Sequence, residues 1–159
     1  MNALANEEVG KYLNASFVSS FQKVGTFRIV NGRKQGGNVA SYFCTPDGRV
    51  LHALAGPVNA RTLLREARWA VEAYKLALLE NPDDATGLKA FFWKAHAERL
   101  RREHGLDLAR GGGRRNLAKQ GRVHLILAAA PLARLEQVYR LVFEKVLGET
   151  VSTAPVDVQ

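Results

Sequence analysis

Cysteine is almost absent from this sequence, which holds only Cys44 among its 159 residues. A single cysteine excludes a disulfide within the chain, a CxxC redox pair and a cysteine-rich zinc site. The four histidines are scattered along the sequence and show no spacing typical of metal ligands. We therefore expect no metal and no cofactor.

Long apolar runs are missing as well. The longest run is far shorter than the roughly 20 residues that a membrane-crossing helix needs. Residues 1–8 carry neither the basic nor the apolar region of a signal peptide. These absences predict a cytoplasmic protein without membrane insertion. With 47% hydrophobic residues, the chain can nevertheless bury a core, and its length predicts one domain with a helical appendix.

The clearest local pattern is a β-hairpin from Val39 to Gly56. Two runs rich in strand-favouring residues flank Pro46-Asp47-Gly48. Proline fixes its own φ, aspartate can bond its own backbone, and glycine accepts the positive φ of a tight turn. The rest of the chain is expected to pack on this hairpin or extend from it.

Capping residues and apolar periodicity predict the remaining elements. Asn6 and Asn59 are suitable N-caps, and Gly105 is a suitable helix stop. Asn116 to Ala130 fits either a strand or a buried helix by pattern, and we favour helix. The other predicted elements are a helix from Asn6 to Asn14, a strand from Phe17 to Val24 that Thr26 to Val30 prolongs, a loop from Asn31 to Asn38, a helix from Asn59 to Leu79, a helix from Asn81-Pro82-Asp83-Asp84 to His104, and a helix from Leu132 to Leu147.

Two stretches resemble the thioredoxin-like superfamily. Glu8 to Val18 is similar to the end of that family's first helix entering its second core strand, and Val39 to Gly56 with the following capped helix is similar to its hairpin and last helix. The resemblance covers roughly residues 6 to 80. It implies an α/β chain with an incomplete thioredoxin-like fold (helix, strand, hairpin, long helix) at 1–80. The pattern of the remaining residues predicts a helical C-terminal extension at 81–148 and a flexible tail at 149–159.

The sequence departs from that family where the family carries its chemistry. No strand precedes the first helix, no cysteine precedes Cys44, and Gly36-Gly37-Asn38 stands where a proline usually precedes the hairpin. The resemblance thus implies a non-catalytic scaffold or protein-interaction domain, with its protein partner unspecified. Because the first strand is missing, Phe17 to Val24 is an open sheet edge unless the C-terminal extension covers it, which predicts a homodimer.

Cys44 and His52 are the candidate residues for a thiol-dependent enzyme, the least favoured of three functions. A two-residue turn pairs position 43 with His52 and places Cys44 on the opposite face, whereas a three-residue loop pairs position 42 with His52 and places Cys44 on the same face. A thiol in mid-strand is usually an inert small hydrophobic group. The sequence leaves both registers open.

Positive charge is concentrated between Lys89 and Arg122. Ten basic and three acidic residues lie there, so this segment carries +7 of the formal net charge of +8. The alternative function is therefore a nucleic-acid-binding protein, and a solvated or protein-facing surface is the competing interpretation. The candidate contacts are Arg101, Arg102, Arg110, Arg114, Arg115, Lys119 and Arg122.

Overall fold

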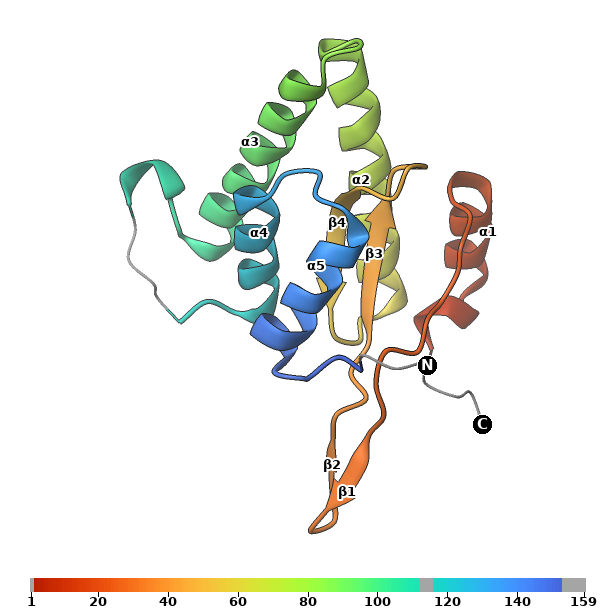
Figure 1. Ribbon diagram of the computed structural model, residues 1–159. Helices are drawn as coiled ribbons and strands as arrows, with labels where there is room; N and C mark the ends of the chain where they lie inside the picture. Colours follow the sequence, from red (N-terminus) through yellow and green to blue (C-terminus); the bar gives the residue numbers. More distant parts are fainter. Residues whose placement is uncertain (1, 112–115, 153–159) are drawn as a thin grey trace.

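The computed structural model describes residues 2–111 and 116–152, which form a mixed α/β arrangement of helices around one central hairpin (Figure 1). Within these residues, no helix combines the length and the apolar character needed to cross a membrane. The elements in chain order are η1 (Ala3–Ala5), α1 (Glu7–Ser16), β1 (Arg28–Val30), β2 (Arg33–Gln35), β3 (Ala40–Cys44), β4 (Val50–Ala55), α2 (Ala60–Glu80), α3 (Ala85–His104), η2 (Leu108–Arg110), α4 (Lys119–Ala129), α5 (Leu135–Leu141) and the π-helical turn η3 (Val142–Leu147).

The predicted central hairpin is confirmed as the antiparallel pair β3–β4. Its turn is closed by a hydrogen bond of 2.8 Å from the Thr45 amide to the Arg49 carbonyl. Gly48 adopts a φ of +81°, which a side chain would disfavour. Phe43 pairs with His52, and a bulge after Phe43 makes Cys44 pair with Val50.

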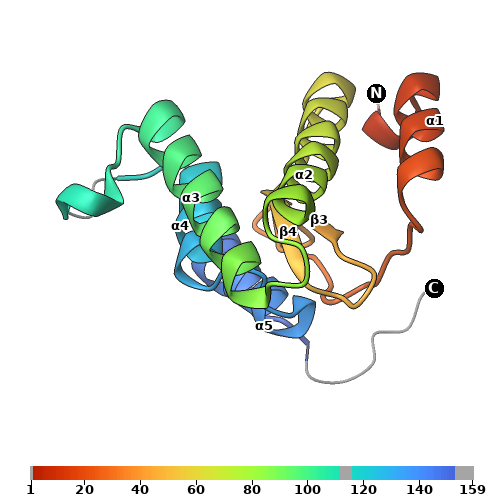
Figure 2. The same ribbon diagram turned by 90° about the horizontal axis from the view of Figure 1, so that it is seen from above.

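Strand β4 is buried along nearly its whole length because helices cover both sides of the hairpin (Figure 2). Leu51 and Leu54 join the apolar cluster that also includes residues of α1, α2 and α3. Val50 and Ala53 join the cluster formed with α4, α5 and η3. Any polar side chain on this strand must consequently find its partners inside the protein.

The predicted helix caps are confirmed. The side chain of Asn6 accepts a hydrogen bond of 3.2 Å from the Val9 amide, and that of Asn59 accepts one of 2.8 Å from Thr62. Gly105 ends α3 in the left-handed conformation, with a φ of +68°. Local capping chemistry thus sets where α1, α2 and α3 begin or end.

The ambiguous segment from Asn116 to Ala130 contains helix α4, as favoured by the sequence analysis. The last helix, however, begins at Leu135 and not at Leu132, so its predicted start was wrong. The backbone just before Leu135 instead forms hydrogen bonds with the central hairpin. The Val50 amide donates to the Ala133 carbonyl, and the Leu135 amide donates to the Gly48 carbonyl, both at 2.9 Å. Gly148 ends the helical turn η3 as predicted.

The predicted strand from Phe17 to Val24 is wrong. Among the described residues no strand lies beside this segment, and Val18 and Phe21 are almost fully exposed, so their strand-like pattern buries nothing. The predicted loop from Asn31 to Asn38 instead contains β2, which pairs with β1. Positive φ angles of 51° at Asn31 and 74° at Gly32 form the two-residue turn between them, and this hairpin projects from the body of the protein (Figure 1).

The described strands form two separate two-stranded sheets, so a thioredoxin-like sheet is not shown. A division of the chain near residue 81 stays a prediction, although the cluster around Val50 and Ala53 joins elements from both sides of it. Of the predicted tail, residues 149–152 are described and residues 153–159 lie outside the described part. In the described part of this tail, the Ser152 amide donates a hydrogen bond of 2.9 Å to the Val24 carbonyl.

Candidate metal centre

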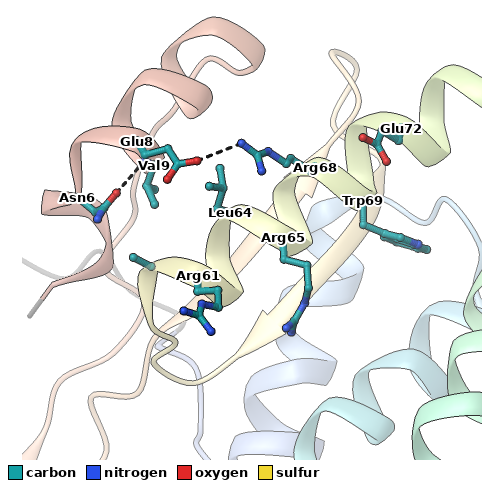
Figure 3. A pocket seen from close by; sticks show the side chains of 10 residues that line it. Asn6, Glu8, Val9, Arg61, Leu64, Arg65, Arg68, Trp69 and Glu72 are labelled. Carbon is teal, nitrogen blue, oxygen red and sulfur yellow. Dashed lines mark hydrogen bonds and ion pairs between the residues drawn. The ribbon is translucent and has the colours of Figure 1, made fainter.

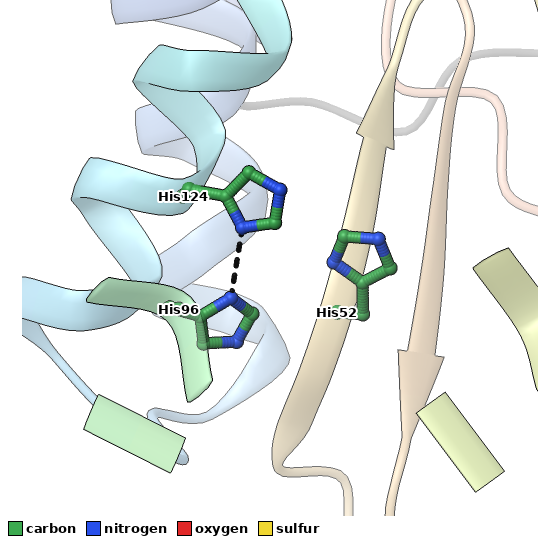
Figure 4. Close-up of side chains that lie close together, drawn as sticks. All are labelled: His52, His96 and His124. Atoms are coloured by element: carbon green, nitrogen blue, oxygen red, sulfur yellow. Dashed lines mark hydrogen bonds between the residues drawn. The ribbon is translucent and has the colours of Figure 1, made fainter. Parts of the chain in front are cut away.

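Three histidines from three different elements meet beside the central hairpin (Figure 4). His52 lies on β4, His96 on α3 and His124 on α4. Their exposed fractions are 0%, 1% and 0%. The ring centroid of His124 lies 5.3 Å from those of both His52 and His96. Histidines that are scattered along the sequence therefore form one cluster in the fold.

Helical periodicity explains why His96 points inward. Phe92, His96 and Leu100 follow one another at four-residue steps along α3, and all three are fully buried. His124 is buried next to Val123 on α4, which packs against β4 and α3. His52 is enclosed because its strand is covered on both sides.

Each histidine turns its Nε2 atom toward an oxygen. The distances are 2.7 Å from His52 to Glu66 Oε2, 2.9 Å from His96 to the Leu51 carbonyl, and 3.8 Å from His124 to Glu103 Oε2. The Nδ1 atoms of His96 and His124 lie 3.0 Å apart. Nδ1 of His52 is buried and has no hydrogen-bond partner among the described residues. Figure 4 shows a ring nitrogen of His52 on the edge that faces the other two rings.

The hydrogen bonds determine which nitrogens carry protons. The Leu51 carbonyl can only accept, so His96 carries its proton on Nε2 and has a lone pair on Nδ1. The proton in the bond between the two Nδ1 atoms must then belong to His124. The Glu66 carboxylate also accepts, which leaves a lone pair on Nδ1 of His52. Of the three Nδ1 atoms, those of His52 and His96 thus carry a lone pair, and that of His124 carries a proton.

A buried ion-pair network surrounds the histidines. Arg99 contacts both oxygens of Glu66, at 2.6 and 3.0 Å, and both oxygens of Glu103, at 3.1 Å each. Arg65 reaches Glu66 from the surface, with Nε 3.0 Å from Oε1. Two carboxylates thus face two guanidinium groups, and the network is balanced without a charged histidine.

The pKa values agree with neutral imidazoles. Burial lowers the pKa of His52, lowers that of His96 to about 3 and lowers that of His124 to about 2. Burial alone would raise the pKa of Glu66, but hydrogen bonds from His52 and Arg99 outweigh burial and hold it below its ordinary value. The cluster therefore presents neutral nitrogens beside an ionised carboxylate at neutral pH.

Trp69 separates the histidine cluster from a groove between α1 and α2 (Figure 3). The groove has a volume of about 820 Å³, and Arg68 points across it toward Glu8. Trp69 points the other way: its ring lies edge-on to His52 with centroids 4.9 Å apart, and Arg99 lies 4.8 Å above it. The Trp69 ring thus lies between the histidines and the groove.

The donor set fits a divalent transition-metal ion. One ligand atom from each of the three histidines lies within 4.8 Å of the others. A tetrahedral ion with Zn–N bonds of about 2.0–2.1 Å needs nitrogens roughly 3.4 Å apart, so the widest pair has to approach by about 1.4 Å at most, while the Nδ1 atoms of His96 and His124 have to separate by about 0.4 Å. Metal-bound histidines usually donate their second N–H to a carboxylate or carbonyl, and Glu66 and Leu51 already supply such acceptors here.

Comparison of the chain with protein-family models, with curated proteins and with solved structures finds no match.

The structure separates the two candidate thiol-site residues. Because Phe43 pairs with His52, the register is the one that places Cys44 away from His52. Phe43 stacks on His52, whereas Cys44 packs in the cluster around Val50. Burial, with a smaller contribution from Glu136, raises the pKa of the Cys44 thiol to about 11. This environment disfavours a nucleophilic thiolate.

The basic candidates do not converge on one described site. Arg101 pairs with Glu98 at 2.7 Å, and Arg110 pairs with Asp107 at 3.6 Å. Arg114 and Arg115 lie outside the described residues. The remaining candidates, all exposed, are Arg102, Lys119 and Arg122. Nucleic-acid binding by this segment stays a prediction.

Among the residues of this cluster, only His52 was a candidate from the sequence, and there as a partner for the Cys44 thiol. The others are His96, His124, Glu66, Arg99 and Glu103. One signal was available, because a histidine at the apolar spacing of Phe92 and Leu100 indicates a buried imidazole. The meeting of β4, α3 and α4 is a tertiary relationship that no short spacing encodes.

Proposed function

We propose that this protein binds a divalent transition-metal ion, with Zn²⁺ as the best match, through Nδ1 of His52, His96 and His124. The observation that carries the proposal is the orientation of the three rings: the Nδ1 atoms turn inward while the Nε2 atoms face oxygens. Imidazole nitrogen suits Zn²⁺, Cu²⁺, Ni²⁺ and Fe²⁺, and the cluster has no thiolate.

The role of the ion is to hold elements together. Its three ligands come from β4, α3 and α4, so binding cross-links the hairpin to two helices that follow it far along the chain. Because the unfolded chain offers no preformed site, the free energy of binding adds to the stability of the fold. The nearly complete burial of the ligands supports a non-catalytic role, since a substrate cannot reach the ion in this conformation.

Cobalt substitution tests the proposal. Protein freed of metal with a chelator is titrated with Co²⁺, and visible d–d absorption is followed before displacement by Zn²⁺. We expect saturation at one ion per chain, with no sulfur-to-cobalt charge-transfer band. Variants His52→Ala and His96→Ala should lose the absorption, whereas the matched control Cys44→Ser should keep it.

Failure of the wild-type chain to bind Co²⁺ or Zn²⁺ at micromolar concentrations overturns the proposal. Retention of binding by both histidine variants overturns the assignment of the ligands. If the variants do not fold, the wild-type chain still decides the matter, because metal bound to this cluster must raise its unfolding midpoint.

Self-association is a separate proposal, and it no longer rests on the sheet edge predicted at Phe17 to Val24, because that segment forms no strand. Val18, Phe21, Phe27 and Ile29 are exposed by 103%, 86%, 57% and 70%, and they lie on the segment that includes the projecting hairpin. A second copy of the chain is an occupant that could cover this segment. Light scattering that gives a monomer at micromolar concentration would reject the homodimer.

A further inference from the structure

We propose that Glu103, His104 and Nε2 of His124 form an outer metal site through which the buried centre is loaded. This inference rests on the proposed metal centre, because the two sites share the imidazole of His124. The outer site faces the opposite nitrogen of that ring. It therefore lies between the buried cluster and solvent.

The three residues of the outer site lie close enough together to hold a metal ion. One ligand atom from each of Glu103, His104 and His124 lies within 4.8 Å of the others. Glu103 Oε2 is 3.8 Å from His124 Nε2, and the rings of His104 and His124 have centroids 6.0 Å apart. Gly121 lets α4 approach this group, because a Cβ there would lie 3.0 Å from the His104 ring.

Exposure decreases from the outer site to the inner one. The side chain of Glu103 is 35% exposed and His104 is half-buried, whereas the side chain of His124 is 0% exposed. A metal ion arriving from water meets the carboxylate and His104 before it can reach the enclosed rings. The outer site is therefore the side from which an ion from water would approach the sealed centre.

His124 also supplies an unsatisfied atom that points to a ligand. Its Nε2 is buried and has no hydrogen-bond partner among the described residues. Because Nδ1 of His124 donates its proton toward His96, the lone pair of the ring lies on Nε2. That lone pair faces the Glu103 carboxylate, an arrangement that a cation between them would stabilise. The metal-free state thus presents its free nitrogen to the outer site.

Transfer inward requires a change of tautomer at His124. When the ion bonds to Nδ1, the proton on Nδ1 leaves to water, and Nε2 takes up a proton from water, keeps it, and donates a hydrogen bond to Glu103. The ring is neutral before and after, so no net proton is gained or lost at His124. A neutral imidazole has one lone pair, so His124 serves one site at a time. We therefore expect one bound ion per chain near neutral pH.

Stopped-flow uptake of Co²⁺ by the metal-free chain of 159 residues tests the inference. We expect His104→Ala to slow loading at least tenfold, while equilibrium dialysis shows one ion per chain and an affinity within about threefold of the wild type. Glu103→Gln should also slow loading. Its matched control is Glu98→Gln, which changes an exposed carboxylate on the same helix and should load at the wild-type rate.

The possible results separate the two proposals. Loading of His104→Ala at the wild-type rate, with equilibrium binding intact, overturns the outer site and leaves the buried centre standing. Absence of equilibrium binding in the wild type overturns both. If His104→Ala does not fold, His104→Gln replaces it, because glutamine keeps a side chain of similar size beside Gly121. This variant should also load Co²⁺ at least tenfold more slowly than the wild type.

Discussion

Nε2 of His52 lies 2.7 Å from Oε2 of Glu66, although the two residues stand on β4 and α2. This bond fixes the tautomer of His52 and leaves Nδ1 facing the other two histidines. Since Arg99 holds the same carboxylate with two hydrogen bonds, Glu66 links the histidine cluster to the charge network around it.

Glu66→Gln should destabilise the metal-free fold by about 3 kcal/mol, because it leaves the buried Arg99 guanidinium without one of its two carboxylates. Urea unfolding measures the change. The control Glu72→Gln alters an exposed carboxylate on the same helix and should stay within about 0.5 kcal/mol of the wild type. Equal stability of the two variants would show that the ion pair between Glu66 and Arg99 does not stabilise the fold.

The metal-free protein should lose stability as the pH falls below about 6.5, the ordinary pKa of histidine. Burial keeps His52, His96 and His124 neutral in the fold, whereas the unfolded chain protonates them, so the unfolded state binds more protons. The loss should approach about 4 kcal/mol per pH unit for three histidines. Urea midpoints between pH 8 and pH 5 test this, and midpoints independent of pH would contradict it.

Trp69 should report metal binding through its fluorescence. Its ring lies 4.9 Å from His52 and 5.4 Å from His96, so Cu²⁺ or Co²⁺ in the cluster should quench its emission strongly. The variant Trp93→Phe isolates this signal, since Trp93 is 41% exposed on α3. The reciprocal variant Trp69→Phe should show much weaker quenching, and equal quenching in both would place the ion elsewhere.

Cys44 should react slowly with iodoacetamide. A thiol pKa of about 11 leaves roughly a hundredfold less thiolate at pH 8 than an ordinary cysteine has. The native protein should therefore be alkylated about two orders of magnitude more slowly than the urea-unfolded chain. Equal rates in the two states would restore Cys44 as a candidate nucleophile.

Local chemistry made much of the fold predictable. The turn at Pro46-Asp47-Gly48 and the caps at Asn59 and Gly105 act within a few residues, and the structure has all three. The predicted strand from Phe17 to Val24 failed because a strand requires a neighbour, and none of the described strands lies beside that segment. The start of α5 was misplaced for a related reason, since Ala133 bonds to Val50 across the fold.

Short-range sequence patterns could not predict the candidate metal centre. His96 could be read as a buried histidine from its spacing with Phe92 and Leu100. Its proximity to His52 and His124 depends on how α3 and α4 pack against β4, and these histidines are separated by 44 and 28 positions. Residue spacing identifies metal sites when the ligands share one motif, which is not the case here.

Unfolding of the 159-residue chain with and without Zn²⁺ tests the central claim most directly. Chelator-treated protein is compared with the same protein at a free Zn²⁺ concentration of about 100 times the dissociation constant found by dialysis. We expect one ion per chain and a gain of about 2.7 kcal/mol in the free energy of unfolding, lost again on chelation. Superimposable unfolding curves, with no ion retained on dialysis, would contradict the account.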